Sequence, residues 1–264
     1  SPRRRLVNPE TERAQLVASC QLTDSALLTL KAPYAARNAQ PGQFLMLRIP
    51  NRPDLTTPRP ISVADADLTS NTVSLLIQRK GCGTTVLCSL RQATEVLLWG
   101  PLGRPFSLLE RGRALLVGGG VGVAPLLFLA KRLTECGIAV TAVYGAKTKT
   151  QLHLKARLES LSDNLVVCTE DGTEGVCGSA VSAMRQQLAQ NRFDRVYLCG
   201  PPSMVRHALP LITKAKATAQ VLLEGRMLCG LGVCACCTIK WQGRLLRLCT
   251  DGPVLDVPAA AEDD

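Results

Sequence analysis

Aromatic side chains are scarce in this chain and make up only 3% of its 264 residues. A hydrophobic core therefore has to be built from Leu, Val, Ile and Ala, although 46% of all residues are hydrophobic. Proteins that bind single-stranded nucleic acid usually stack the bases on aromatic side chains. The scarcity of such side chains thus argues against nucleic-acid binding.

Negative charge is in deficit, since Asp and Glu number 21 against 31 Lys and Arg, which gives a net charge of +10. Apart from Arg3–Arg5, the excess of basic residues is scattered along the chain. We interpret it as a solvated basic surface. The alternative is attraction to an acidic partner or to phosphate-bearing cofactors.

The sequence also has no long hydrophobic run. Its longest uncharged stretch, Ala114–Ala130, has 17 residues with four glycines and a proline, whereas a membrane helix needs about 20 apolar residues. The N-terminal residues are basic with no apolar stretch behind them, so we expect no secretory leader. We expect no membrane association.

Cysteine, by contrast, is abundant, with twelve residues. Disulfide frameworks belong mainly to small secreted domains, and this chain has neither their size nor their signals. We therefore expect a cytoplasmic protein whose cysteines serve metal or redox chemistry, and the spacing of the cysteines has to decide which.

Three regions differ in their sequence pattern. The first, residues 1–110, has short apolar runs separated by Pro and Gly turns, among them 44–49, 72–79 and 95–99. Strands this short at this spacing are typical of an antiparallel β-barrel.

The second region, residues 111–223, alternates between strand and helix patterns. Strands are expected at 114–117, 139–144, 165–168 and 195–199, and a helix at 125–136. This alternation predicts a parallel α/β sheet covered by helices on both faces. The third region, residues 224–264, is too short to bury a core of its own and contains five cysteines.

The strongest motif lies in this third region. Four residues separate Cys229 from Cys234, two separate Cys234 from Cys237, and Cys249 follows after eleven more. The pattern C-x4-C-x2-C…C is the plant-type spacing for a [2Fe–2S] cluster. Gly230 and Gly232 let the loop adopt positive φ and turn backbone N–H groups towards the sulfurs.

Two alternatives to the cluster are a structural zinc site and incidental buried thiols. Zinc usually draws its ligands from paired C-x2-C units, and only one such unit is present. Cys236 fits no position of the pattern, so the spacing selects its neighbour Cys237 as the ligand.

A glycine-rich turn follows the first strand of the α/β region. Gly118, Gly119, Gly120 and Gly122 stand between this strand and the expected helix, where backbone amides and the helix dipole can hold a pyrophosphate. The alternative is a tight turn without a ligand. No acidic residue closes the next strand, so the pattern does not distinguish NADH from NADPH.

Other motifs are weaker. Cys199, Gly200 and Pro201 end another strand, where parallel sheets bind ligands, although Cys199 can equally be a buried small side chain. The loop at 169–172 is interpreted as a polar loop. Arg59 and Ser62 can clamp a diphosphate by charge-assisted hydrogen bonds, or be an ordinary surface arginine and turn serine. Neither of the two histidines lies in a nucleophile or metal motif, which suits chemistry carried by cofactors.

The order of these motifs resembles the ferredoxin–NADP reductase superfamily, which pairs an FAD-binding barrel with a nicotinamide-binding α/β domain. The C-terminal motif, Glu224-x-x-Met227-x-Cys229-Gly230 closed by 249–253 (CTDGP), resembles the electron-transfer subunits of two-component, NAD-dependent dihydroorotate dehydrogenase. The resemblance covers the chain from about residue 12 to 255. It implies FAD, NAD(H) and a [2Fe–2S] cluster as cofactors.

The resemblance also implies site residues. Those expected at FAD are Arg59, Pro60, Ile61, Ser62, Ile77, Gln78, Arg79, Gly83 and Thr84; at the nicotinamide cofactor, Gly118, Gly119, Gly120, Gly122, Cys199, Gly200 and Pro201; at the cluster, Cys229, Cys234, Cys237 and Cys249. Gln78 stands where an aromatic residue is expected, and Cys236 is additional. No residue of the chain is expected to act as an acid or base catalyst.

The implied function is to pass electrons from a partner's FMN, reduced by dihydroorotate in pyrimidine biosynthesis, through the cluster and FAD to NAD⁺. The implied partner is the catalytic FMN-containing dehydrogenase subunit in a heterotetramer. One alternative keeps the fold but serves a hydrogenase, a sulfide dehydrogenase or another oxidoreductase. The other is a zinc-binding interaction protein.

Overall fold

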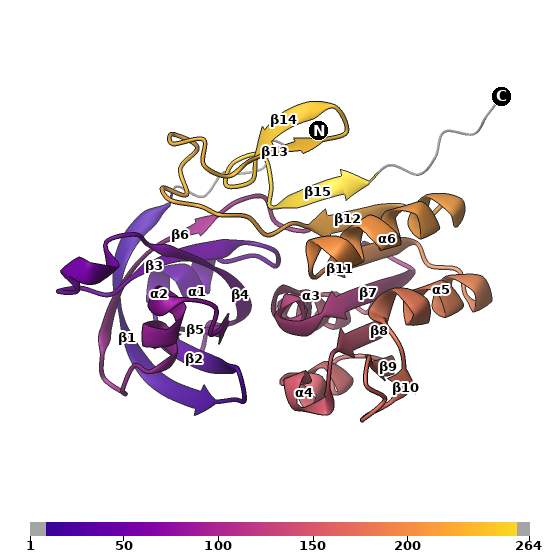
Figure 1. The fold of residues 1–264 in the computed structure, drawn as a ribbon, viewed down its shortest axis with the longest axis horizontal. Coiled ribbons are helices and arrows are strands. Elements are labelled where there is room, and N and C mark those ends of the chain that lie inside the picture. The colour runs from indigo at the N-terminus through magenta and orange to yellow at the C-terminus, as the bar shows by residue number, and fades with distance from the viewer. Residues whose placement is uncertain (1–8, 258–264) are drawn as a thin grey trace.

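The structure is a computed structural model that describes residues 9–257, so the basic cluster Arg3–Arg5 lies outside the described residues. Its first part is a closed antiparallel barrel with the strand order β1-β2-β5-β4-β3-β6 (Figure 1). This barrel confirms the expected architecture. The strands are β1 (Glu10–Gln21), β2 (Ser25–Lys31), β3 (Phe44–Arg48), β4 (Arg59–Asp67), β5 (Thr72–Gln78) and β6 (Glu95–Leu102).

Alternation along these strands creates the barrel core. Side chains of successive strand residues point to opposite faces, and the inward set is almost entirely aliphatic, including Leu16, Leu28, Leu45, Leu75 and Leu98. The chain crosses the barrel ends through α1 (Pro33–Asn38), η1 (Pro53–Leu55) and α2 (Cys82–Cys88). A core without aromatic stacking is thus filled by branched side chains, as the composition requires.

The second part is a seven-stranded sheet with the order β10-β9-β8-β7-β11-β12-β15. Its first six strands pair in parallel, as expected. These strands are β7 (Arg113–Gly119), β8 (Ala139–Ala146), β9 (Asn164–Thr169), β10 (Val176–Cys177), β11 (Arg195–Cys199) and β12 (Ala219–Leu222).

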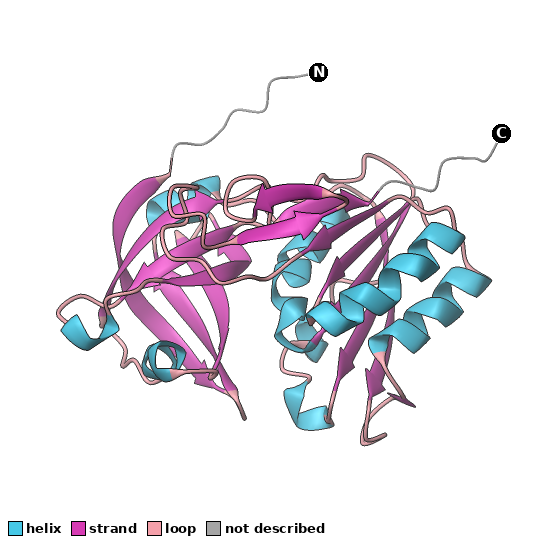
Figure 2. Cartoon of the chain, turned by 45° about the horizontal axis from the view of Figure 1, so that its top comes forward, coloured by secondary structure: helices cyan, strands magenta, loops and turns pink. Residues whose placement is uncertain are grey.

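Helices cover both faces of this sheet (Figure 2). Ala114 and Leu116 of β7 belong to the same apolar cluster as α3 (Val123–Glu135) and α4 (Lys155–Glu159). Leu115 and Val117 belong instead to the cluster of α5 (Ala180–Gln190) and α6 (Pro202–Lys214). Between residues 9 and 257, no helix is long and apolar enough to cross a membrane.

The C-terminal segment lies across the barrel and the sheet (Figure 1). Its hairpin, β13 (Thr238–Trp241) and β14 (Arg244–Arg247), stands apart from both sheets, but β15 (Val254–Val257) pairs antiparallel with β12. The expected division at residue 224 did not anticipate this return to the sheet. A shared apolar cluster holds the segment in place, formed by Phe44, Met46, Leu102, Met227, Cys237, Leu248, Cys249 and Leu255.

Ion pairs add to the contact between barrel and sheet. Asp65 of β4 lies 2.9 Å from Lys131 Nζ on α3 and 2.9 Å from Arg157 Nη2 beside it on α4. Asp65 is largely buried, with 20% of its side chain exposed, so its two cationic partners satisfy a carboxylate that water reaches poorly.

Two leucines of the C-terminal segment test how it is held. Leu255 is 3% exposed and Leu245 is 75% exposed. We expect Leu255→Ala to lower the free energy of unfolding by about 2–4 kcal/mol, because it leaves a cavity in the shared cluster. The matched change Leu245→Ala should stay within about 0.5 kcal/mol. Urea titrations followed by circular dichroism measure both; equal effects would contradict the shared cluster.

Candidate functional site

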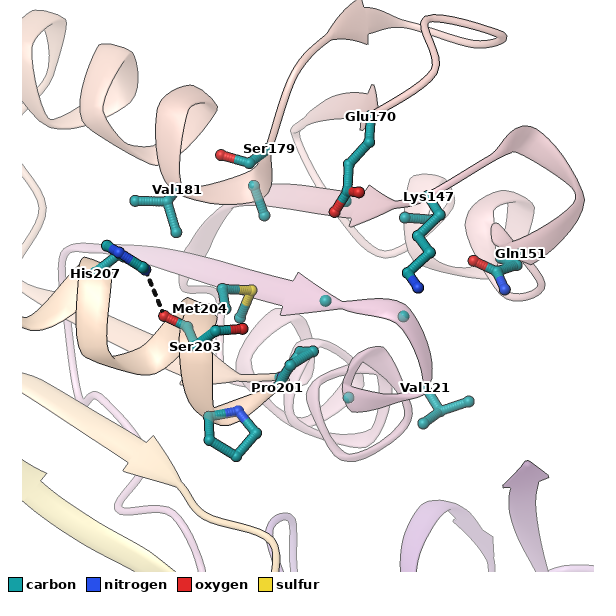
Figure 3. A pocket seen from close by; sticks show the side chains of 18 of the residues that line it. Val121, Lys147, Gln151, Glu170, Ser179, Val181, Pro201, Ser203, Met204 and His207 are labelled. Carbon is teal, nitrogen blue, oxygen red and sulfur yellow. Dashed lines mark hydrogen bonds between the residues drawn. The ribbon is translucent and has the colours of Figure 1, made fainter. Parts of the chain in front are cut away.

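A pocket of about 700 Å³ lies at the carboxyl edge of the parallel strands (Figure 3). This is where open parallel sheets bind their ligands. Two backbone turns form its floor, one after β7 and one after β11. Of the residues predicted at the nicotinamide cofactor, this pocket is lined by Gly119, Gly120, Gly122, Gly200 and Pro201.

Glycine is required where these two turns meet. A Cβ at Gly122 would lie 2.6 Å from the carbonyl oxygen of Cys199, and one at Gly119 would lie 2.7 Å from Met204 Sδ. Gly120 adopts a φ of +55°, which most side chains avoid. The turn can therefore press its backbone against the neighbouring loop and leave its amides facing the pocket.

Two predicted residues lie behind the pocket lining. Gly118 is still part of strand β7, and Cys199 ends strand β11 with its side chain fully buried. Burial raises the pKa of the Cys199 thiol well above its ordinary value, so the thiol stays neutral. For Cys199 this favours the alternative of a buried small side chain.

Sequence analysis missed the charged side chains that line this first pocket. Glu170 and Lys147 follow the ends of neighbouring strands, and His207 comes from α6 (Figure 3). Arg185 comes from α5. The loop containing Glu170 was expected to be only a polar loop. Its position directly after a parallel strand was the one available signal.

A second pocket of about 200 Å³ lies where the three parts of the chain meet. The barrel contributes the predicted residues Pro60, Ile61, Ser62, Ile77, Gln78 and Thr84, the start of α3 contributes Ala124 and Pro125, and the C-terminal segment contributes Glu224, Gly225 and Met227. No single part of the chain could enclose this space.

The two pockets adjoin at four residues that line both: Gln78, Lys80, Val121 and Glu224. Lys80 Nζ and Glu224 Oε2 lie 3.9 Å apart across this junction, an exposed ion pair of small energetic weight. A flat ring in the second pocket would thus have one edge or face open to a ring entering from the first. That arrangement suits hydride transfer between two cofactors.

Arg59 and Gly83 stand beside the second pocket and touch each other. A Cβ at Gly83 would lie 2.4 Å from Arg59 Nε. Nη1 of the guanidinium donates to Thr57 Oγ1 at 2.5 Å and to the carbonyl oxygens of Thr57 and Pro58. Within residues 9–257 no acceptor binds Nε or Nη2, which can donate to a phosphate group. Arg59 and Gly83, which are both predicted at FAD, therefore lie together beside Thr84, and Thr84 lines the second pocket.

The structure does not bring Arg79 to either pocket. Its guanidinium donates to the carbonyl oxygens of Leu22 at 3.2 Å and Ser25 at 3.0 Å, and also to Gln21. Arg79 follows the last residue of β5 and turns towards the β1–β2 connection, away from Gln78. Its side chain braces that connection.

Three of the four predicted cluster cysteines lie on the loop before β13, and Cys249 follows β14; together they form two pairs. Cys237 Sγ lies 3.3 Å from Cys249 Sγ, and both residues are buried. The thiol of Cys229 contacts that of Cys234. Within residues 9–257, no three Cys, His, Asp or Glu side chains surround a single point closely enough for one metal ion. Two sulfur pairs fit a group with two irons, each of which takes two thiolates.

Backbone amides point at these sulfurs. The N–H of Gly232 donates to Cys249 Sγ at 3.1 Å, and that of Leu231 to Cys229 Sγ at 3.4 Å. Gly230 and Gly232 have positive φ, +72° and +78°, which confirms the conformational reason for both glycines. Cys236 is exposed, whereas Cys237 is buried beside Cys249.

The surroundings affect the thiols unequally. Partial burial raises the pKa of Cys229, but hydrogen bonds, chiefly from backbone N–H groups, outweigh it and lower the pKa to about 6. Burial, with the neighbouring Cys237, raises the pKa of Cys249 to about 12. The buried pair therefore needs a bound cation before both of its members can be thiolates.

The fold and this site define an oxidoreductase with an NAD-binding α/β domain and an iron–sulfur segment. The model of the "Oxidoreductase NAD-binding domain" matches residues 116–209. That of the "Iron-sulfur cluster binding domain of dihydroorotate dehydrogenase B" matches residues 224–259.

The chain belongs to the family of dihydroorotate dehydrogenase B (NAD⁺) electron transfer subunits. It is 36% identical to the subunit of that name from Shouchella clausii, over 89% of this chain and 91% of the relative. It is 37% identical to the Streptococcus pneumoniae R6 subunit, over 81% and 84%.

Solved structures agree with this fold. The NADH-dependent reduced ferredoxin-NADP oxidoreductase, described for flavin-based electron bifurcation, has a TM-score of 0.85 and 29% identity over 92% of this chain and 87% of its own. A ferredoxin NADP⁺ reductase from Neisseria gonorrhoeae shares the fold at a TM-score of 0.61, with 17% identity over 78% and 91%.

Adjacent cysteines test the assignment of cluster ligands. We expect Cys237→Ser to lose most of its iron and visible iron–sulfur absorbance, because it removes a buried thiolate from one of the two sulfur pairs. Cys236→Ser, the matched control, should keep about two irons per chain. Iron analysis of anaerobically purified protein measures both, and loss of iron from the Cys236 variant alone would reverse the assignment.

Two nearby glycines test the Arg59 position. Gly83→Ala should push the guanidinium aside and weaken FAD retention by about tenfold, the cost of one charge-assisted hydrogen bond. Gly81→Ala adds a methyl group where no atom lies within 4 Å and should leave retention unchanged. Dilution and ultrafiltration, followed by flavin absorbance, compare the two; identical retention would remove Arg59 from the FAD site.

Proposed function

We propose that this chain is the electron transfer subunit of a dihydroorotate dehydrogenase complex, passing electrons between a partner's FMN and NAD⁺. The observation that carries the proposal is the junction of the two pockets, with the cysteine loop packed on the same barrel. FAD supplies the needed exchange, since it accepts or gives two electrons with nicotinamide and single electrons with a [2Fe–2S] cluster.

The residues of the second pocket have distinct tasks in this proposal. Pro60, Ile61, Ser62 and Ile77 border the flavin ring, while Arg59, Gly83 and Thr84 hold its phosphates. The glycine turn after β7 and the turn at Gly200–Pro201 bind the dinucleotide, with the first pocket supporting this assignment by its position. The residues of the chain itself bind the two cofactors, orient their rings and exclude water from them.

The cysteine loop is attached to the barrel at a defined place. Trp99 Nε1 on β6 donates to the carbonyl oxygen of Cys229 at 3.3 Å. A Cβ at Gly230 would lie 2.8 Å from both Leu102 Cδ1 and Met46 Cγ. These contacts hold the cluster ligands close to the barrel strands, which favours electron exchange with a flavin in the second pocket.

Exposed apolar side chains on the cysteine loop and the neighbouring hairpin support the proposal that a partner protein binds there. Leu228, Leu231 and Val233 are 46%, 51% and 84% exposed, and Leu245 of the neighbouring hairpin is 75% exposed. Large apolar side chains grouped on a surface are typical of protein interfaces. We propose that the catalytic FMN-containing subunit covers this side, as part of a heterotetramer in the reducing cytoplasm.

A second candidate keeps the fold and exchanges the partner. The similarity to the NADH-dependent reduced ferredoxin-NADP oxidoreductase, at a TM-score of 0.85, favours a flavin and iron–sulfur subunit that serves another oxidoreductase. The chemistry of the two pockets would be the same in both cases.

The test begins with the anaerobically purified chain. Flavin absorbance, about two irons per chain and NADH-dependent dye reduction are expected, with NADH preferred over NADPH. A colourless protein that contains zinc would refute the proposal and leave a zinc-binding interaction protein.

The partner is tested separately by adding the catalytic subunit encoded in the same genome. Dihydroorotate-dependent reduction of NAD⁺ by the mixture, absent with either subunit alone, is expected. A coloured subunit that reduces dyes with NADH but never couples to dihydroorotate would instead favour the second candidate.

A further inference from the structure

One carboxylate joins the barrel, the α/β domain and the junction of the two pockets. Asp24 lies in the connection between β1 and β2 and accepts hydrogen bonds from four side chains. Ser25 Oγ and His153 Nε2 each lie 2.8 Å from its Oδ1, and Gln78 Nε2 and Gln151 Nε2 lie 2.9 and 3.2 Å from its Oδ2.

The donors come from both sides of the domain boundary. Ser25 and Gln78 belong to barrel strands, whereas Gln151 and His153 follow β8 in the α/β domain. Gln151 ends the 3-10 helix η3 (Lys149–Gln151), and His153 lies in the loop after it. His153 is almost completely buried, with 4% of its side chain exposed, and Gln151 also lines the first pocket (Figure 3). Asp24 therefore accepts all four hydrogen bonds only when the barrel and the α/β domain are packed together as in this structure.

The protonation state of Asp24 decides which way its partners face. Burial raises the pKa of this carboxyl, but hydrogen bonds from Gln78, His153 and Ser25 outweigh it and lower the pKa to about 2. The group is therefore a carboxylate at neutral pH and can only accept hydrogen bonds. Gln78 has to present its amide nitrogen, and His153 the protonated Nε2, towards Asp24.

This orientation leaves the other half of the Gln78 amide for a ligand. No described residue donates a hydrogen bond to Gln78 Oε1, and Gln78 is one of the four residues that line both pockets. With its nitrogen committed to Asp24, the side chain offers the junction an acceptor. An aromatic residue at this position would offer no amide carbonyl.

We propose that Asp24 is a positioning residue, which holds Gln78 so that its carbonyl oxygen accepts a hydrogen bond from an N–H group of the ring bound at the junction. The inference rests on the proposed function, in which nicotinamide and flavin meet there. Two rings carry suitable donors, the carboxamide of the nicotinamide and the N–H groups of the flavin. Because Gln151 and His153 also bind Asp24, the position of the Gln78 side chain depends on how the α/β domain packs against the barrel.

The test uses the full chain loaded with FAD and its cluster. Gln78→Met removes the acceptor at nearly constant volume, and Asp24→Asn removes the constraint that orients it. Asp65→Asn is the matched control, because it also removes a barrel aspartate that binds the α/β domain, through Lys131 and Arg157, but lies outside both pockets. Flavin content and thermal unfolding are recorded for each variant.

The first readout is binding without turnover. Difference spectra of the oxidised flavin are titrated with NAD⁺ and with 3-acetylpyridine adenine dinucleotide, which lacks the carboxamide N–H. If that group is the donor, the wild type prefers NAD⁺ by about tenfold. The preference disappears in Gln78→Met and Asp24→Asn and persists in Asp65→Asn. The same two variants raise KM for NADH more than they lower kcat in dye reduction.

The second readout identifies a flavin donor. In that case the preference for NAD⁺ is unchanged, but the flavin absorption maximum and midpoint potential shift in Gln78→Met and Asp24→Asn and not in Asp65→Asn. Either pattern supports the proposal. If Asp24→Asn does not retain FAD, His153→Leu replaces it, because it removes one of the donors that seat Asp24 and leaves Gln78 intact.

Three results would overturn the inference. One is that both readouts in Gln78→Met match the wild type. Another is that Asp24→Asn, or its replacement, behaves like Asp65→Asn while Gln78→Met differs. The last is a wild-type protein without flavin absorbance or without a difference spectrum on addition of NAD⁺, which would refute the proposed function together with this inference.

Discussion

Helix α3 is packed on both sides, and the geometry of the whole site depends on that packing. Its Leu126, Leu129 and Leu133 belong to the core of the sheet, whereas its Phe128 belongs to the core of the barrel. The helix therefore cannot shift towards one domain without opening a cavity in the other, which costs several kcal/mol for side chains of this size. The distance between barrel and sheet is set by a shared helix rather than by a linker.

The consequence for the site is direct, since the same helix begins at the glycine turn. Val121 of this turn lines both pockets, and Ala124 and Pro125 of the first helical turn line the second. Packing that holds α3 thus also holds the edge against which two cofactors would meet. Asp24 and Asp65 add polar contacts at the same boundary between barrel and α/β domain.

Local motifs were predictable from the sequence because their geometry is local. The cysteine loop needs its spacing and its glycines whatever surrounds it, and the choice of Cys237 over Cys236 as the residue facing inward agrees with their burial. The geometry of the glycine turn, the barrel strands and the parallel strands is local in the same way. Each is specified by neighbours within a few residues, where hydrophobic period and turn chemistry act.

The parts that sequence analysis missed are non-local. Glu170 and Lys147 line one pocket because β8 and β9 are adjacent and parallel, and Asp24 meets His153 across 129 residues of chain. The side chain of Arg79 turns away from the pockets because carbonyl groups of the β1–β2 connection offer it partners. None of these contacts leaves a periodic signal, since each depends on how two separate elements are stacked.

The return of β15 to the sheet shows why a segment without its own core can be ordered. The chain leaves the sheet after Leu222 and comes back at Val254, and the N–H of Leu223 donates to the carbonyl oxygen of Pro253 at 3.0 Å. Both ends of the cysteine segment are therefore fixed, which removes most of the entropy that an open tail would have to lose. The fixed ends also lie in the lining of the second pocket, where Leu222, Leu223 and Pro253 are found. A segment anchored in this way cannot move its cysteines as a free arm would, so the sheet and the barrel together fix the distance between the cysteines and the second pocket.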